Sequence, residues 1–246
     1  MQKMPDSELV SIVMLGSFNP AIFQPHWLGA HHLIRPEEAE NAKIRVIQAE
    51  VADFSTDWFK LQVLQNRFQL VSEDPRQYGP LRDLSAGIFA ILSHTPIKAL
   101  GMNRSFHFSM PSVETWHQIG HQLAPKEHWN EIMETPGLRS MLIQGHRKQP
   151  GHGLLHIKVE PSTQVKPGLF VEVNEEFRTS DDSEPEGAAW VCGRLSEHWD
   201  EVLRIRRRAP RGPRTHLKCL HPFKIRSLQP TALIWVCCSR CVKSGS

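Results

Sequence analysis

Residues 57–110 carry the clearest secondary-structure pattern in the chain and most constrain what it can fold into. Phe59, Leu61 and Val63 alternate with polar residues, as in a strand with one buried face. Asn66-Arg67 then predicts a two-residue turn, because Asn tolerates a positive φ. Phe68 and Leu70 resume the apolar alternation after it, so the pattern predicts a β-hairpin.

A helix and a further strand complete this stretch. Pro80 suits the first position of a helix. Thr95-Pro96 marks its end, and residues 97–110 are predicted as a strand. The expected core stripe of the helix consists of four residues at helical spacing: Leu81, Leu84, Ile88 and Ile91.

The same kinds of pattern extend over the rest of the chain up to about residue 205. Polar caps, prolines and apolar periodicity set the expected boundaries. The predicted strands are 10–18, 44–54, 138–146, 153–160 and 169–177, and the predicted helices are 19–33, a short one from 36, 112–123, 126–133 and 188–205. The last helix is expected to bury a stripe of Val191, Leu195, Trp199 and Val202. On the strand at 138–146, Met141 and Ile143 are expected to point inward, and the outward strand positions are polar with charges of both signs.

The order of these elements predicts an internal duplication. Residues 1–95 and 96–205 each read as strand, helix, three strands, helix, which is a β-α-β-β-β-α unit. Two such units predict an α+β fold, with a largely antiparallel sheet and helices packed on one face. We expect the two halves to form one compact domain, followed by a basic, Cys-rich tail over 206–246. By analogy, this order is similar to the saddle of the TATA-binding-protein fold or to helix-grip ligand-binding folds.

The charge distribution separates the tail from the body. Eleven of the 29 Lys and Arg residues, and none of the 26 Asp and Glu residues, lie from position 204 onward. Residues 1–203 therefore hold 18 basic and 26 acidic residues, a net charge of −8, which argues against a nucleic-acid-binding body. We see no signal peptide and no apolar run long enough to span a bilayer, so a cytoplasmic protein with no membrane partner is expected.

Several short segments resemble a sporadically distributed, functionally uncharacterised bacterial protein family of about 250 residues. The resemblance covers roughly residues 10–203 and implies a bacterial cytoplasmic protein, without indicating catalytic residues. It is carried by SIVMLGSFNPAIFQP at 11–25, HLIRPEEA at 32–39, RFQL at 67–70, PLRD at 80–83, HTP at 94–96, LAPK at 123–126, GLRS at 137–140, KVEPS at 158–162 and VN at 173–174.

The tail departs from this resemblance and leaves two interpretations open. It is either an altered end, such as a reading-frame shift would produce, or a genuine appended segment. In the second case, His216, Cys219, Cys238 and Cys241 have the spacing of a tetrahedral zinc site. In the first case these cysteines occur by chance.

A second candidate metal pair, His117 and His121, is predicted on one side of the helix at 112–123. The Glu of a metalloprotease motif is missing, because position 118 is Gln. Trp116, Ile119 and Leu123 are expected to form the core stripe of this helix, with both imidazoles on its flank. The alternative to a metal pair is therefore an ordinary boundary face.

These patterns favour a non-enzymatic protein–protein interaction module, dimeric through a sheet edge or face. No nucleophile elbow, phosphate-binding loop or dinucleotide fingerprint is present. One alternative is a small-ligand-binding protein with a sheet–helix cavity near Trp27, Trp58 or Trp116, and another is a metal-dependent enzyme using His117 and His121. Nucleic-acid binding is expected only through the basic run of the tail.

Overall fold

The computed structural model describes residues 4–146, 153–179 and 187–204. The chain divides into two units, Met1–Ala209 and Pro210–Ser246, and all described residues belong to the first. None of the helices in these residues is long and apolar enough to cross a membrane. In chain order the elements are β1 (Ser7–Gly16), the 3₁₀ helix η1 (Pro20–Ile22), α1 (Pro25–Ala30), α2 (Pro36–Glu40), β2 (Lys43–Ile47), β3 (Val51–Ser55), β4 (Lys60–Leu64), β5 (Arg67–Ser72), the 3₁₀ helix η2 (Pro75–Gln77), α3 (Tyr78–Ile91), β6 (Ile97–Ser109), α4 (Val113–Leu123), β7 (Met141–His146), β8 (Leu154–Pro161), β9 (Gly168–Arg178) and α5 (Gly187–Arg204).

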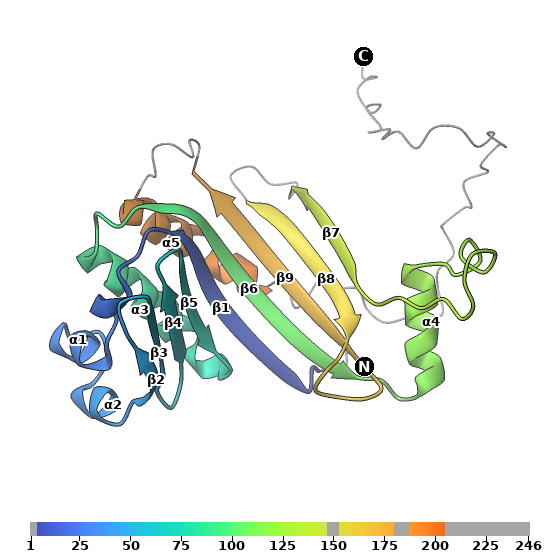
Figure 1. Cartoon of the computed structure of the whole chain (residues 1–246), viewed down its shortest axis with the longest axis horizontal. Helices are drawn as coiled ribbons and strands as arrows, with labels where there is room; N and C mark the ends of the chain where they lie inside the picture. Colours follow the sequence, from blue (N-terminus) through green and yellow to red (C-terminus); the bar gives the residue numbers. More distant parts are fainter. Residues whose placement is uncertain (1–3, 147–152, 180–186, 205–246) are drawn as a thin grey trace, which may run out of the picture. The chain divides into compact units, whose positions relative to one another are not determined.

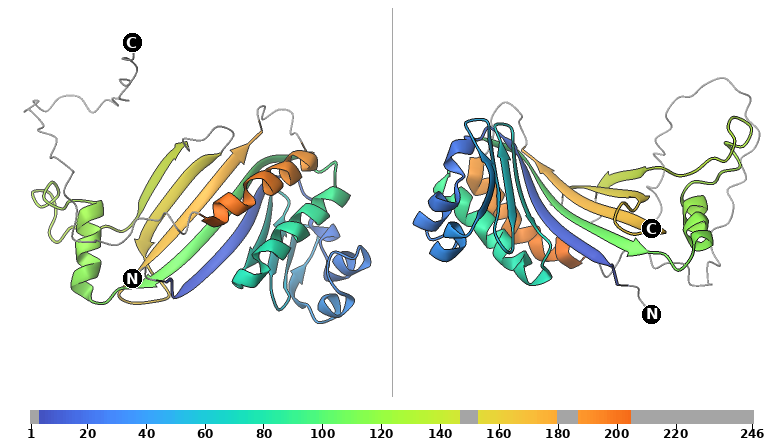
Figure 2. Two further views of the ribbon diagram at one scale, coloured as in Figure 1. Left: turned by 180° about the vertical axis from the view of Figure 1, so that it is seen from behind. Right: turned by 60° about the horizontal axis from the view of Figure 1, so that its bottom comes forward.

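The described strands form one nine-stranded sheet in the order β2-β3-β4-β5-β1-β6-β9-β8-β7 (Figure 1). Every pairing between neighbouring strands is antiparallel. Helices α3 and α5 lie against the same face of the sheet, as the view from behind in Figure 2 shows. The expected α+β architecture with a large antiparallel sheet is therefore confirmed.

The main core lies between this sheet face and helices α3 and α5. Phe68 on β5 contacts Phe89 on α3 edge to face, with ring centroids 5.0 Å apart. The predicted stripe of α5 is confirmed, because all four of its residues are buried: Val191, Leu195, Trp199 and Val202. Ile91 is the exception in the α3 stripe, since it lies at the helix end and is exposed.

The central strands β1 and β6 pair over almost their whole length, from Ser7↔His107 to Gly16↔Ile97. A buried ion pair joins them, in which Arg104 of β6 contacts Glu8 of β1. Arg104 also donates a hydrogen bond to the carbonyl oxygen of Leu203 in the last turn of α5. A cation near the C-terminus of a helix interacts favourably with its dipole, so this side chain also helps to anchor α5 on the sheet.

Four predictions about local structure were wrong. The single helix predicted at 19–33 is a 3₁₀ helix, η1, followed by the short helix α1. The predicted strand at 44–54 is two strands, β2 and β3, because the chain turns at residues 48–50. The hairpin turn consists of Gln65 and Asn66, one residue earlier than predicted, since Leu64 pairs with Arg67. Residues 126–133 form turns and bends rather than a helix. In each case the neighbouring strands and helices were predicted correctly, whereas the exact boundaries depended on local turn geometry.

The first part of the described chain therefore has one strand more than expected. Residues 7–91 contain β1, short helices, four strands and α3. Residues 97–204 contain β6, α4, three strands and α5, in the predicted order. The prediction of a repeated β-α-β-β-β-α unit is thus wrong in strand number for the first part, while the duplication itself stays a prediction.

Two glycines give opposite expectations for stability. Gly193 lies in the exposed middle of α5, where a Cβ atom would meet nothing within 4 Å. Gly193→Ala should raise the free energy of unfolding by about 0.5–1 kcal/mol, because Ala loses less backbone entropy in a helix. A Cβ at Gly16 would lie 2.2 Å from the carbonyl oxygen of Pro96. Gly16→Ala should therefore lower the free energy of unfolding by about 1–3 kcal/mol. Urea denaturation of both variants tests this pair, and equal effects would contradict it.

Candidate functional site

Helix α4 is positioned by a polar cap at the end of β6. The Ser112 hydroxyl accepts a hydrogen bond from the backbone N–H of Thr115 at 3.2 Å. Glu114 lies in the first turn, where a hydrogen bond from its own backbone and one from Ser112 lower the pKa of its carboxyl group. The helix starts where the sequence pattern places it, with Ser112 as the capping residue.

The expected core stripe of α4 is wrong, because no residue of this helix is buried. Trp116 and Ile119 are half-buried, and Leu123 is exposed. The reason is the location of the helix: α4 lies beyond the strand ends, at the right of Figure 1, instead of lying on a sheet face. An amphipathic pattern therefore formed a helix here without a large surface to cover its apolar side.

A groove of about 540 Å³ lies between α4, the segment that follows it and the ends of β8 and β9. Its apolar lining comes from Trp116, Leu138, Val159 and Leu169, and polar groups are placed among them. The polar lining residues include His117, His121, Lys126, Glu127, Asn130 and Glu160. The groove thus combines an aromatic and aliphatic surface with charges of both signs.

The structure brings both predicted histidines of α4 into this groove. His121 Nε2 lies 3.0 Å from Glu127 Oε1, so its side chain already has an acidic partner. His117 lies next to Trp116, with ring centroids 5.0 Å apart. Among the described residues there is no group of three or more His, Cys, Asp or Glu side chains that could hold a metal ion.

The other predicted zinc ligands lie outside the described residues: His216, Cys219, Cys238 and Cys241. A zinc site therefore stays a prediction. Cys192 is the one cysteine among the described residues and lies on α5, half-buried. Burial raises the pKa of its thiol, which makes Cys192 a poor nucleophile at neutral pH.

Exposed large apolar side chains are concentrated around α4, the segment after it and β7. Of the eleven such residues in the described chain, seven lie between positions 113 and 143. We call these seven residues the α4–β7 apolar surface: Val113, Leu123, Trp129, Ile132, Met133, Leu142 and Ile143. Ile132 is the most exposed of the seven, at 74%.

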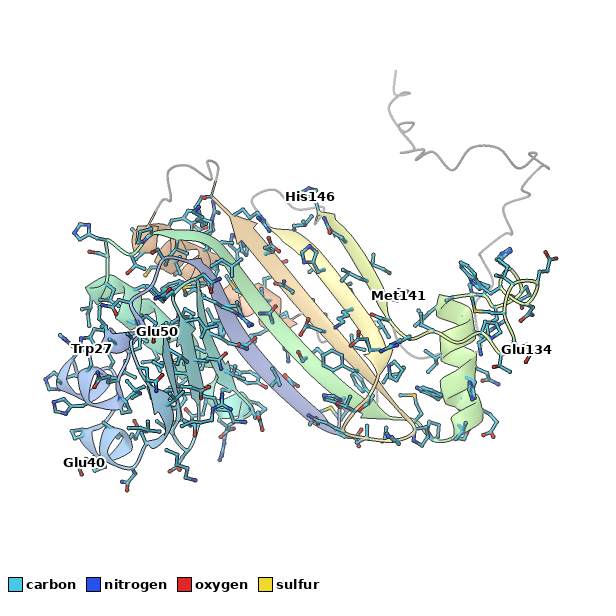
Figure 3. All side chains as sticks on the ribbon, in the orientation of Figure 1. Trp27, Glu40, Glu50, Glu134, Met141 and His146 are labelled. Carbon is cyan, nitrogen blue, oxygen red and sulfur yellow. The ribbon has the colours of Figure 1, made fainter. Side chains whose placement is uncertain are left out.

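Strand β7 forms one edge of the sheet and adjoins this region. Figure 3 labels its two ends, with Met141 nearer to α4 and His146 at the far end. The helix-side residues Met141 and Ile143 pair with Val159 and Ile157 of β8. They were expected to point into the core, yet Ile143 is 54% exposed, because none of the described helices lies over this end of the sheet.

The opposite face of the sheet carries polar residues along its centre. Asn103 donates a hydrogen bond to Ser11 Oγ at 3.2 Å, and Ser105 donates one to Glu172 at the same distance. No described helix covers this face (Figures 1 and 2). The sequence pattern did not single out these central residues, because residues 97–110 were predicted as a strand without an assignment of its two faces. The signal was the run of Gly, Asn, Ser and His at alternate positions from 101 to 107.

This polar face has charges of both signs. Lys158 pairs in register with Glu172, and His156 with Asn174. His156 Nδ1 lies 3.7 Å from Glu176. The mixed polar composition expected for the outward strand positions is therefore present, and it provides no concentrated positive surface for phosphates.

The fold and the two surfaces define the class of this protein as α+β, with a nine-stranded antiparallel sheet, one polar face and an exposed apolar region at one end. Neither the models of known protein families nor the curated proteins gave a match to this chain. The resemblance to an uncharacterised bacterial family accordingly stays a prediction.

His107 on the polar face gives the protein an expected sensitivity to acid. Its ring is buried, lies 2.8 Å from Ser162 Oγ and packs beside Phe170. Burial lowers the pKa of His107 in the folded protein, so below about pH 6.5 the unfolded chain binds a proton that the folded chain resists. Stability should fall as the pH decreases through this window, and His107→Gln should weaken the dependence.

Urea denaturation between about pH 7.5 and about pH 5.5 measures this effect. His26→Gln, which removes an exposed imidazole, is the matched control. If the His107→Gln variant lost as much stability as the wild type over this range, burial of His107 would not be the cause.

Proposed function

We propose that this protein is a non-enzymatic protein–protein interaction module that binds its partner through the α4–β7 apolar surface. The supporting observation is the concentration of exposed large apolar residues at 113–143, whereas most large apolar residues in the rest of the described chain are buried. Exposed apolar patches on water-soluble surfaces mark interaction sites, because burying them against a partner is favourable. Trp129 is the strongest candidate anchor, since Trp is enriched among the residues that dominate interface energies.

The architecture supports this role, because the α4–β7 apolar surface lies outside the main hydrophobic core. Helices α3 and α5 cover the part of the sheet formed by β1, β5 and β6. The β7 end of the sheet has no comparable cover among the described helices, and α4 has no buried residue. The protein therefore keeps a stable core in one part and an adhesive surface in another.

Internal duplication belongs to the same proposal. In each part the first strand lies beside the last strand, as β1 does with β5 and β6 with β9. The remaining strands then follow outward in reverse chain order, as β4-β3-β2 and β8-β7. Each part ends in a helix, and these two helices, α3 and α5, pack against each other. This common pattern supports two copies of one unit that later diverged at α4 and β7.

Replacing the apolar anchors should abolish partner binding. Trp129→Ser combined with Ile132→Ser should weaken the dissociation constant of the purified complex by at least about tenfold, because both side chains would lose their apolar contacts. The partner is first isolated with the wild-type chain as bait and then purified, so that the dissociation constant is measured by calorimetry with two components.

Leu15→Ser and Ile91→Ser are the matched controls. Their side chains are 43% and 42% exposed but lie outside the α4–β7 apolar surface. Both controls should bind like the wild type. Equal affinity of the Trp129→Ser, Ile132→Ser variant and the wild type would contradict the proposed surface.

A second candidate function is small-ligand binding in the α4 groove. The supporting observation is the position of Trp116 beside the apolar residues of a 540 Å³ groove, since pockets for small ligands combine such a lining with a few polar groups. His117 and Lys126 favour a ligand that joins an apolar body to a carboxylate. This groove lies at the end of the sheet, away from the filled core between the sheet and helices α3 and α5.

A panel of apolar carboxylates, screened by thermal shift, tests this candidate. Gly120 lines the groove. A Cβ atom added at Gly120 would have Leu138 Cβ as its nearest neighbour, 4.0 Å away. Gly120→Leu should therefore occupy the groove and remove the stabilisation by any ligand found. Gly193→Leu is the control, because Gly193 is helical, exposed and outside the groove. Loss of binding in both variants, or in neither, would contradict a site in the groove.

A further inference from the structure

The two edges of the sheet differ in how well they are protected. Strand β2 carries Lys43 and Arg45, and its pairing with β3 shifts register between Ile44 and Val46. Charged residues and bulges are the devices by which natural sheets block pairing with another strand. The β2 edge therefore has two of these protections.

The β7 edge has neither. Its sequence, Met-Leu-Ile-Gln-Gly-His, has no Lys, Arg, Asp, Glu or Pro. It pairs with β8 in unbroken register from Met141↔Val159 to His146↔Leu154. Its outer side thus offers a regular row of backbone N–H and C=O groups, bordered by Leu142 and Ile143, which are 63% and 54% exposed.

We infer that the occupant of this edge is the β7 strand of a second copy of this chain, paired antiparallel so that one sheet continues through both copies. This inference rests on the proposed function. It names the partner that binds the β7 part of the α4–β7 apolar surface. Self-pairing of β7 opposes no two charged side chains, because the strand contains no Asp, Glu, Lys or Arg. A foreign acidic or basic strand would gain no charge pairing from this edge.

Symmetry fixes how the two copies would meet. A twofold axis that pairs a strand with itself side by side must stand perpendicular to the sheet. Residues that face each other across the axis must point to the same side of the sheet. Because side chains alternate along a strand, the axis must then pass beside a residue and not between two residues, and this residue is either Ile143 or Gln144. Helices α3 and α5 of both copies lie on the same side, and Ile143 of each copy gains apolar neighbours from the other.

The protected β2 edge makes this assembly close at two copies. If both edges were open, copies would add head to tail and form fibres. Because β2 carries charges and a bulge, β7 is the one unprotected edge of the sheet that the described residues form. The structure therefore points to a closed dimer rather than an open polymer.

Light scattering after size exclusion, with the full chain at about 50 μM, tests this inference, since this concentration populates a dimer whose dissociation constant is in the low micromolar range or below. The wild type should have the mass of a dimer. Ile143→Lys should weaken the association by at least about tenfold, because it brings a lysine from each copy close to the axis. The two lysines face each other directly if the pairing is centred on Ile143, and lie diagonally across from each other if it is centred on Gln144. Ile44→Lys at the β2 edge is the matched control, with a side chain 59% exposed, and should stay dimeric.

A photo-crosslinking amino acid distinguishes the edges independently of variant stability. Placed at position 142 it should give crosslinked homodimers, and placed at position 44 it should give none. A monomeric wild type, a dimer that Ile143→Lys leaves unchanged, or crosslinks only from position 44 would overturn the inference. A monomeric wild type whose partner binding is still lost on changing Trp129 and Ile132 would overturn the β7 dimer alone and leave the proposed function intact.

Discussion

The pairing of β1 with β6 is the interaction on which the rest of the structure depends. It is the only link between the strands of residues 7–72 and those of residues 97–178 within the described sheet. The buried contact between Arg104 and Glu8 lies in this seam, and Arg104 reaches the last turn of α5 as well. Breaking one partner of such a pair leaves an uncompensated buried charge, which makes the seam costly to alter.

This seam also determines where the protein is covered and where it is exposed. Helices α3 and α5 pack against each other and on the strands around the seam, which gives those strands a complete core. On the β7 side, covering decreases with distance from the seam, and β7 itself is mostly exposed. On the other side, β3 and β4 still carry buried residues. The exposed apolar region around β7 is therefore a consequence of having two long helices over the centre of a wide sheet.

Much of the fold follows from periodicity that is visible in single segments. The alternation in Phe59, Leu61 and Val63 and the stripe from Val191 to Val202 were read correctly, because their period directly reports one buried face. The segment at 126–133 and the turns around β2 were harder, since they depend on local backbone geometry. Of the candidate site, His117, His121 and Trp116 were identified in advance, but the groove that they line together was not.

The sequence by itself determined which segments are strands and helices and which of their sides are apolar, since these properties depend on residues a few positions apart. Only the tertiary structure decided whether each apolar side would be covered. Trp116 and Leu195 belong to equally regular helical patterns, yet one lines an open groove and the other is fully buried. The difference arises because burial depends on which distant segments reach a given surface, and the pairing order of nine strands sets that reach.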